Sequence, residues 1–409
     1  MRHATGFHAT RIALSAALLA GSFGAGADVI TDWNAKAGEL VAEAKLGTPP
    51  ANRVLAIVQT AVYYGVNAIT GRDPCPRLQA APGASVDAAV AAANRVTLAK
   101  LIPSQQAAIE AAYQAALATV ADGPAKAAGI AVGERAATAV LASRADDGAG
   151  GPEAYRPHTT AGAYVPTAMP AVPQWQGRKP WLMTSAAQFR PGPPPALTSV
   201  AWAREYNEVK ALGGKASARR TAEQTEIARF WEYSLPPIYH GIVRSVATAP
   251  GREVTQNARL FAAVTQAMDD GMIAVFEAKY HYNFWRPTTA IRNGDIDGND
   301  ATERDASWTP FIDVPMHPEY PSAHSILAGA VSAVLQAEVG SGPMPVLTTT
   351  SPTAKGAARR WMKVDDFTQE VADARVYDGV HYRFSTEVGT AMGKQIGVLA
   401  ARKFLQSPE

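Results

Sequence analysis

The placement of glycine and proline constrains the fold of this chain more than any other sequence feature. Alanine-rich, helix-forming stretches fill residues 28–147, and the breaks between them lie at residues 71–82, 103–104 and 122–124. Such breaks mark helix ends, so we expect about four helices here. The breaks are too frequent for sustained coiled-coil heptads. Strand-like alternation is scarce along the whole chain, and no internal repeat occurs. The sequence therefore predicts an all-α fold built from helical bundles.

The composition changes in residues 148–198. Proline is frequent there, with ten prolines between Pro152 and Pro195, and this excludes long helices. Five aromatic residues in the same segment can be buried, which a disordered spacer could not do. We therefore expect a helical scaffold in residues 28–150, an ordered proline-rich loop in residues 151–200, and a C-terminal helical bundle in residues 201–409.

The N-terminus has the layout of a cleavable secretory signal. Arg2 and Arg11 precede an apolar run at residues 12–20, and small residues end the segment at residues 25–27. We expect residues 1–27 to be a signal peptide and the chain to be exported, periplasmic or secreted. No later stretch approaches the roughly 20 apolar residues needed to span a bilayer, so we expect no membrane span.

Charge and cysteine content exclude several classes of function. Residues 1–27 carry two arginines and no acid, so their removal takes the formal net charge from +2 to 0. A neutral chain has no overall electrostatic attraction for nucleic acid or for an anionic membrane. Cys75 is the only cysteine, so it cannot form an internal disulfide, and no base stands beside it in the sequence. We expect no catalytic role for Cys75.

The C-terminal half contains recognisable helix signals. Thr221 and Gln224 have the spacing of a capping box, in which each side chain satisfies a backbone N–H at a helix start. Further helices are expected at about residues 257–286, 322–339, 366–377 and 386–405.

The first of three segments with clustered cations and histidines is residues 279–287. If the helix continues to Pro287, Lys279, Asn283 and Arg286 stand at positions i, i+4 and i+7 and share one face. Two cations on one face repel each other unless an anion lies between them.

The second segment is residues 317–324, which lead into an apolar run. Ser322 and Ala323 are expected at the start of the following helix, where free backbone N–H groups and the positive end of the helix dipole favour an anion. His324 in the first turn can reach the same anion. His317 stands five residues before Ser322.

The third segment contains Arg375 and His381, with Gly379 allowing a tight bend between them. Taken alone, each of the three segments has an ordinary structural explanation. A lysine–arginine pair is usually solvated, a serine before a helix is usually a cap, and a histidine is usually hydrogen-bonded. The order and combination of the three segments favour a site for a tetrahedral oxyanion.

Lys-x6-Arg-Pro, Pro-Ser-x-His and Arg-x5-His, in this order, resemble the signature shared by vanadium-dependent haloperoxidases and type 2 phosphatidic acid phosphatases. The wider chain is similar to the secreted bacterial, vanadium chloroperoxidase-like branch of the haloperoxidases. The segments that carry this similarity are residues 29–34, 218–225, 279–287, 297–299, 317–325 and 379–389.

The resemblance implies a role for each residue of the signature. Lys279, Arg286 and Arg375 match the cations that hold the oxygens of vanadate or phosphate. Ser322 matches the hydroxyl that hydrogen-bonds one oxygen. Ala323 stands where the family usually has glycine, so its backbone N–H is kept while its methyl group crowds the site.

The resemblance also assigns the histidines. His381 matches the residue whose ring nitrogen bonds vanadium, or phosphorus in the phosphatases, and His324 matches the acid–base histidine. His317 resembles the second histidine of bromoperoxidases, which favours bromide or iodide over chloride. The alternative is that His317 only hydrogen-bonds within its loop.

The implied function is a vanadate-dependent haloperoxidase, which oxidises halide with hydrogen peroxide to hypohalous acid. Lys279 is then catalytic as well, because it withdraws charge from the activated oxygen. Vanadate is the expected cofactor, and phosphate can occupy the same site. A small organic acceptor is the expected second substrate, and a homo-oligomer stays open.

Two alternatives remain. The first is a soluble secreted acid phosphatase, in which His381 forms a phosphohistidine and His324 protonates the leaving group. These phosphatases usually place an aspartate four residues after the nucleophile, whereas this chain has Ser385, which we expect to cap the last helix; Glu387 or Asp378 would have to replace the missing carboxylate. The second alternative is a binding protein that captures the oxyanion without turnover.

Overall fold

The computed structural model describes residues 28–72, 78 and 80–405. The expected signal peptide and Cys75 lie outside these residues. The described chain forms thirteen α-helices and one two-stranded hairpin, which confirms the all-α prediction. No helix among the described residues is long and apolar enough to cross a lipid bilayer.

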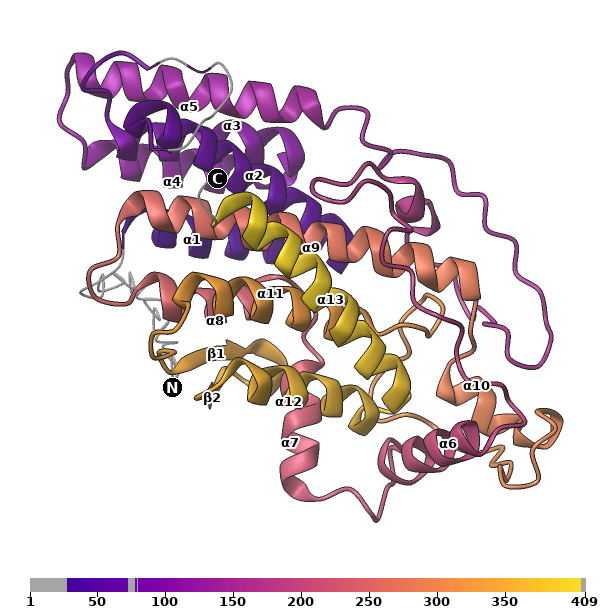
Figure 1. The fold of residues 1–409 in the computed structure, drawn as a ribbon. Coiled ribbons are helices and arrows are strands. Elements are labelled where there is room, and N and C mark those ends of the chain that lie inside the picture. The colour runs from indigo at the N-terminus through magenta and orange to yellow at the C-terminus, as the bar shows by residue number, and fades with distance from the viewer. Residues whose placement is uncertain (1–27, 73–77, 79, 406–409) are drawn as a thin grey trace, which may run out of the picture.

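Five helices form the N-terminal part, as the glycine and proline breaks predict to within one helix (Figure 1). Asp28 and Thr31 form a reciprocal capping box that starts the first helix. Gly71, in the left-handed conformation, ends the second. The helices are α1 (Val29–Glu43), α2 (Thr48–Thr70), α3 (Val86–Leu101), α4 (Gln106–Ala118) and α5 (Pro124–Ser143).

The proline-rich segment that follows contains only the short 3-10 helix η2 (Pro173–Gly177), and buried ion pairs fasten it to the rest of the chain. Arg178 donates to both carboxylate oxygens of Asp269, at 2.7 and 3.0 Å, and to Asp147 at 2.8 Å. Asp270 accepts three consecutive backbone N–H groups, from residues 181–183. Because these partners are buried, the segment is held as an ordered loop against one helix.

Eight helices and the hairpin form the C-terminal part. The helices are α6 (Val200–Leu212), α7 (Ala222–Trp231), α8 (Pro237–Ala247), α9 (Val254–Tyr282), α10 (Pro287–Arg292), α11 (Ala323–Val339), α12 (Val364–Tyr377) and α13 (Arg383–Phe404). The predicted capping box of Thr221 and Gln224 starts α7. Strands β1 (Leu347–Ser351) and β2 (Ala357–Trp361) pair antiparallel, which the sequence analysis did not predict.

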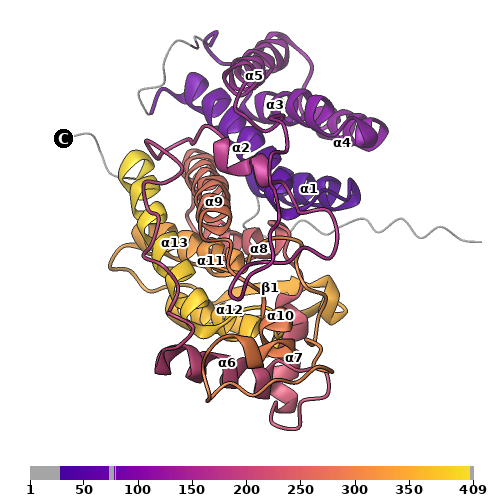
Figure 2. The ribbon, with the colours of Figure 1, turned by 90° about the vertical axis from the view of Figure 1, so that its right-hand side faces the viewer.

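The long helix α9 lies at the centre, between α2 of the N-terminal layer and the pair α11 and α13 (Figures 1 and 2). It is buried over most of its length. One apolar cluster extends from Ile30 in α1 to Phe404 in α13. The core is therefore continuous from the N-terminal to the C-terminal helices, and the division of the chain at residue 200 stays a prediction.

Helices α11 and α13 approach each other closely because glycines line their contact. A Cβ atom on Gly393 would lie 2.1 Å from the backbone oxygen of Ile326, and one on Gly329 would lie 2.3 Å from the backbone oxygen of Thr390. This contact sets the N-terminus of α11 beside the N-terminus of α13, where the backbone N–H of Ser322 donates to the carbonyl of Ser385 at 3.1 Å.

We predict that Gly393→Ala destabilises the protein by about 1–3 kcal/mol or more, because the added methyl group forces the two helices apart. Thermal or denaturant unfolding measures the change. Gly150→Ala is the matched control, since nothing lies within 4 Å of a Cβ atom there. Equal stability of both variants and the unmodified protein would contradict this packing.

A buried histidine links α8 to α1. The Asn34 side chain donates from Nδ2 to Nδ1 of His240 at 3.0 Å, and Nε2 of His240 has no partner. Burial, with a smaller contribution from Arg244, lowers the pKa of His240 to about 3. In the unfolded chain the same imidazole titrates near its ordinary value of about 6.5.

The lowered pKa of His240 makes stability sensitive to acid. Its contribution is fully present above about pH 6.5 and is lost as the pH falls toward 3, because the unfolded chain then binds a proton that the folded chain excludes. We predict a loss of about 3 kcal/mol between pH 7 and pH 4 from this group. In denaturant unfolding, His240→Gln should flatten the pH profile by this amount, and exposed His158→Gln should leave it unchanged.

Candidate oxyanion site

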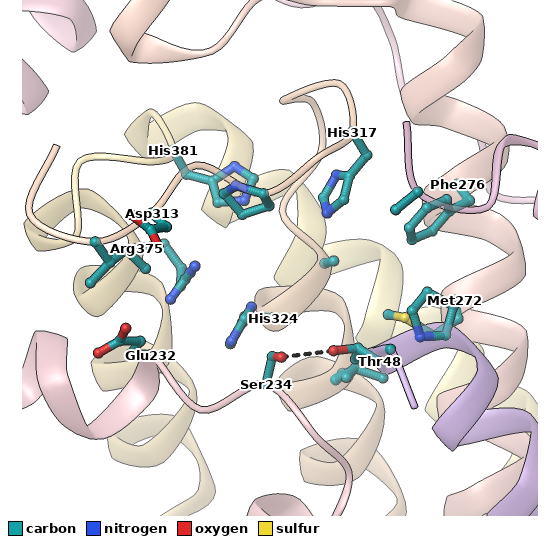
Figure 3. Close-up of a pocket in the computed structure, with 17 residues that line it drawn as sticks. Thr48, Glu232, Ser234, Met272, Phe276, Asp313, His317, His324, Arg375 and His381 are labelled. Carbon is teal, nitrogen blue, oxygen red and sulfur yellow. Dashed lines mark hydrogen bonds between the residues drawn. The ribbon is translucent and has the colours of Figure 1, made fainter. Parts of the chain in front are cut away.

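A cavity of about 330 Å³ lies at the N-terminus of α11. Its walls come from the start of α2, the middle of α9, the loops at residues 232–234 and 312–317, the end of α12, and His381 before α13 (Figure 3). Five residues singled out from the sequence line it: His317, Ala323, His324, Arg375 and His381. Lys279, Arg286 and Ser322 are buried and do not line the cavity, but Arg286 forms hydrogen bonds with the lining residues His317 and His381.

Lys279 occupies the last turn of α9 and is completely buried. Its Nζ donates to the backbone carbonyls of Pro318 at 3.0 Å and Glu319 at 2.7 Å. Burial, and next the charge of Arg286, hold the pKa of Lys279 well below its ordinary value. An anion in the cavity would favour the charged form.

The predicted single helical face for Lys279, Asn283 and Arg286 is wrong. Helix α9 ends at Tyr282, and Asn283 is left-handed, with a φ of 48°. Arg286 is extended because it precedes Pro287, which starts α10. The turn still brings both cations to the site, while the side chain of Asn283 bonds Tyr155 instead.

The guanidinium of Arg286 is buried and uses all of its nitrogens. Nε donates to the carbonyl of His317 at 2.9 Å, and Nη1 donates to the carbonyl of Val380 at 2.7 Å. Nη1 also lies 3.3 Å from Nε2 of His381, and Nη2 lies 2.9 Å from Nδ1 of His317. Burial lowers the pKa of Arg286 to about 10, so the group is charged at neutral pH.

Ser322 and Ala323 form the start of α11, as predicted. Ser322 is the N-cap, and its Oγ accepts the backbone N–H of Ser325 at 3.4 Å and the hydroxyl of Ser325 at 3.0 Å. Its own hydroxyl proton can therefore be donated to a third group. Ala323 is half-buried and lines the cavity, so its methyl group occupies part of the wall.

His324 is half-buried, and its Nε2 atom is buried without a partner among the described residues. The backbone carbonyls of Trp231 and Tyr233 bond the ring, and Nε2 has no partner, so Nδ1 carries the proton. Burial first, and then the charge of Arg375, hold the pKa of His324 well below its ordinary value. His324 points toward the hydroxyl pair of Ser234 and Thr48, whose oxygens are 2.7 Å apart (Figure 3).

Arg375 reaches the cavity from α12. Its Nη1 donates to the carbonyl of Trp231 at 3.0 Å and to the carboxylate of Asp378, while its Nε has no partner. Burial raises the pKa of Asp378 to about 7, against the opposing effect of Arg375. Asp378 is thus the ion-pair partner of Arg375. It does not provide the carboxylate that would pair with the nucleophilic histidine of a phosphatase.

His381 has a carboxylate partner that the sequence analysis missed. Nδ1 of His381 lies 2.6 Å from Oε1 of Glu319, and both residues are buried. The two suggested substitutes do not serve this purpose, because Asp378 pairs with Arg375 and Glu387 is exposed. Glu319 is adjacent to the Pro-Ser-x-His motif, but no sequence pattern reports a contact between residues 62 positions apart.

The predicted cap function of Ser385 is also wrong. Helix α13 starts at Arg383 and has Tyr382 as its N-cap. Ser385 lies in the first turn, where its Oγ is 3.5 Å from Nδ1 of His381. The hydroxyl therefore faces the site rather than the helix end.

The site fits a tetrahedral oxyanion. Lys279, Arg286 and Arg375 bring three buried positive charges to one place, and the N-terminus of α11 adds backbone donors. Nε of Arg375 and Nε2 of His324 are buried without partners. Buried polar atoms usually have a partner; an oxyanion can accept from Nε of Arg375, and a protonated oxygen of the anion can donate to the lone pair of Nε2 of His324.

We predict that phosphate stabilises the protein, because an anion offsets the repulsion between the buried cations. At a phosphate concentration one hundred times the Kd, the gain is about 2.7 kcal/mol. Calorimetry with and without phosphate measures it. Lys279→Met should lose most of the gain, whereas exposed Lys36→Met should keep it; equal gains in both variants would contradict the site.

Several known proteins are similar to this chain in sequence. The family model described as the VCPO second helical-bundle domain matches residues 259–408. A vanadium chloroperoxidase from Curvularia inaequalis is 29% identical over 179 residues, which is 36% of this chain and 29% of the relative's length. The alignment thus spans less than a third of that relative.

Solved structures cover nearly the whole chain. The crystal structure of a bacterial vanadium-dependent iodoperoxidase has 25% sequence identity and a TM-score of 0.79, and the match covers 93% of this chain and 98% of that one. A bacterial vanadium-dependent chloroperoxidase in its holo form has the same fold, with 19% identity, a TM-score of 0.68, and coverage of 88% and 93%. The family model and these structures show that the chain is similar to the vanadium-dependent haloperoxidases and has their fold.

Proposed function

We propose that this protein is a vanadate-dependent haloperoxidase that oxidises bromide or iodide with hydrogen peroxide to hypohalous acid. The observation that carries this proposal is that His324, His381 and Arg375 line one cavity, with the buried Lys279 and Arg286 directly behind its wall. The similarity to the bacterial iodoperoxidase over nearly the whole chain supports it.

Each residue of the signature has a separate role in the proposed reaction. Lys279, Arg286 and Arg375 neutralise the oxygens of the anion, and Ser322 donates its hydroxyl proton to one of them. His381 presents a ring nitrogen as the ligand. Bound vanadate would supply a Lewis acid that activates peroxide toward halide. Lys279 lies behind the site, where its charge draws electrons from an oxygen of the anion.

His324 is suited to act as the base. A base must be neutral before it accepts a proton, and the lowered pKa of His324 keeps the imidazole neutral at the pH of the reaction. Its Nε2 has a free lone pair that can take a proton from the incoming peroxide. Arg375, which contributes to the lowered pKa, also repels a proton from the ring until an anion occupies the cavity.

The position of His317 supports the preference for bromide or iodide. The residue lines the cavity and also forms hydrogen bonds within its loop. Its Nδ1 lies 2.9 Å from Nη2 of Arg286, which can only donate, and 3.1 Å from the carbonyl oxygen of Pro318, which can only accept. Nε2 is the ring nitrogen left to interact with a halide or peroxide. Phe276 belongs to an apolar part of the cavity wall beside His317. The centroids of the two rings are 5.1 Å apart.

Phosphomonoester hydrolysis is the second candidate, and the Glu319–His381 pair favours it. Nε2 of His381 would attack phosphorus as the ester P–O bond breaks, and His324 would give a proton to the leaving alkoxide. Glu319 would supply the carboxylate that Ser385 cannot. His324 would first have to gain a proton, against its lowered pKa.

We further propose export of the chain, with residues 1–27 as the signal peptide, and a small organic molecule as the acceptor of the oxidised halide. The layout of the N-terminal sequence supports the first proposal. The lining of the cavity supports the second, because it combines apolar groups such as Met272 and Leu327 with the polar Ser234.

We predict that protein loaded with vanadate oxidises iodide and bromide with peroxide, and that phosphate inhibits this activity. Removing a general base typically costs about 10²- to 10⁴-fold in rate, so His324→Ala should lose this much of kcat. His381→Ala should lose the activity and the tight binding of vanadate, while His281→Ala, on the exposed surface, is the control. Tri-iodide absorbance reports the rate. Ester hydrolysis that vanadate blocks, without any halide oxidation, would favour the phosphatase instead.

A further inference from the structure

The loop that carries Glu319 is fixed by hydrogen bonds of its backbone. Its N–H donates to the carbonyl of Phe284 at 2.9 Å, and its carbonyl accepts from Nζ of Lys279 at 2.7 Å. The preceding carbonyl, of Pro318, accepts from the same Nζ at 3.0 Å. The position of the Glu319 side chain is therefore set by the same lysine that belongs to the oxyanion site.

The carboxylate of Glu319 is directed at one edge of His381. Oε1 lies 2.6 Å from Nδ1 of His381, and it also accepts the backbone N–H of Tyr382 at 3.2 Å. Oε2 is buried and has no partner. Because one oxygen holds both the ring and the backbone beside it, the orientation of the imidazole is defined.

The neighbouring arginine shows which nitrogen of His381 carries the proton. The guanidinium of Arg286 has donors only, and its Nη1 lies 3.3 Å from Nε2 of His381. Nε2 must therefore offer its lone pair, and the proton of the neutral ring is on Nδ1. The Nδ1–H group therefore donates to Oε1 of Glu319.

No other acidic side chain can take this place. Among the described residues, Glu319 is the carboxylate within 4 Å of His381. Asp378 is engaged by Arg375, and Glu387 is exposed. The hydroxyl of Ser385, at 3.5 Å from Nδ1, is at the limit of a hydrogen bond.

We propose that Glu319 is the positioning residue of the site. It keeps the proton of His381 on Nδ1, so that Nε2, which accepts from Arg286, keeps a lone pair that vanadium could take up, and its negative charge would strengthen that nitrogen as a ligand. Two segments of the signature, the one before α11 and the one before α13, are coupled through this contact. The inference rests on the proposed function, in which His381 is the ligand.

Comparing the affinities for vanadate and phosphate distinguishes the positioning role of Glu319 from a merely structural one. Vanadate gains a bond to Nε2, whereas phosphate in the resting site is held by charge and hydrogen bonds. Glu319→Gln keeps an oxygen that accepts from Nδ1 but removes the negative charge. We expect vanadate to bind about ten- to a hundredfold more weakly, as is typical when an outer partner of a ligating histidine is changed. Phosphate should bind as well as before or more tightly, because the site loses a negative charge.

The matched control is Glu205→Gln. Glu205 is equally buried, at 2% exposure, and accepts the backbone N–H of Phe384 at 3.0 Å, but it does not contact the signature residues. Affinities for orthovanadate and inorganic phosphate would be measured by calorimetry on the full chain. The control should leave both affinities unchanged. An equal loss of both anions in Glu319→Gln would indicate a structural role, and unchanged vanadate affinity would likewise overturn the inference.

A spectroscopic measurement tests the protonation state directly. Side-chain ¹⁵N shifts of His381 should show the Nδ1–H form in the unmodified protein, and Glu319→Leu should shift the population toward Nε2–H. An Nε2–H form in the unmodified protein would refute the inference. A different result would contradict the proposed function itself: tight binding of vanadate by the His381→Ala variant, equal to that of the unmodified protein.

Discussion

Two buried cations that lack carboxylate partners of their own determine the arrangement of this site. Lys279 and Arg286 bind backbone carbonyls of the loop at residues 317–319, and Arg286 also binds the carbonyl of Val380. The same groups that hold the charge therefore hold the loops in place. An oxyanion at this site would meet a framework that is already assembled around cationic side chains, so its binding would need little reorganisation.

The close contact of α11 and α13 supplies the other constraint. Glycines along this contact let the two backbones approach, and their N-terminal ends meet at Ser322 and Ser385. His324 is carried by α11, and His381 precedes α13, so the spacing between the two imidazoles follows from helix packing. A larger side chain at this helix contact would therefore change the distance between the two imidazoles at the helix ends.

The sequence predicted much of this protein because local signals and the family signature agree. The helical class, the capping box before α7 and the N-cap at Ser322 depend on short-range patterns. Five-residue strands carry too little pattern to be recognised, so the hairpin was missed. The expected helical face of Lys279 and Arg286 was wrong, because Asn283 ends the helix in a left-handed conformation that Pro287 alone does not reveal.

The largest gap in the sequence analysis concerns contacts between distant residues. The pairing of Glu319 with His381 depends on how two loops meet in space, and neither loop contains a periodic pattern. The burial that lowers the pKa of His324 and His381 is equally a property of the assembled fold. Residue types could be listed from the sequence, but their protonation states could not.

The hydroxyl pair of Thr48 and Ser234 has a consequence for the evolution of the chain. Both residues precede the segment that matches the second helical-bundle domain, and Thr48 belongs to the first turn of α2. The segment from residue 259 onward contains all eight signature residues but only part of the cavity wall. Substitutions at the start of α2 can therefore change the shape of the cavity while the residues from 259 onward that would hold an anion stay the same.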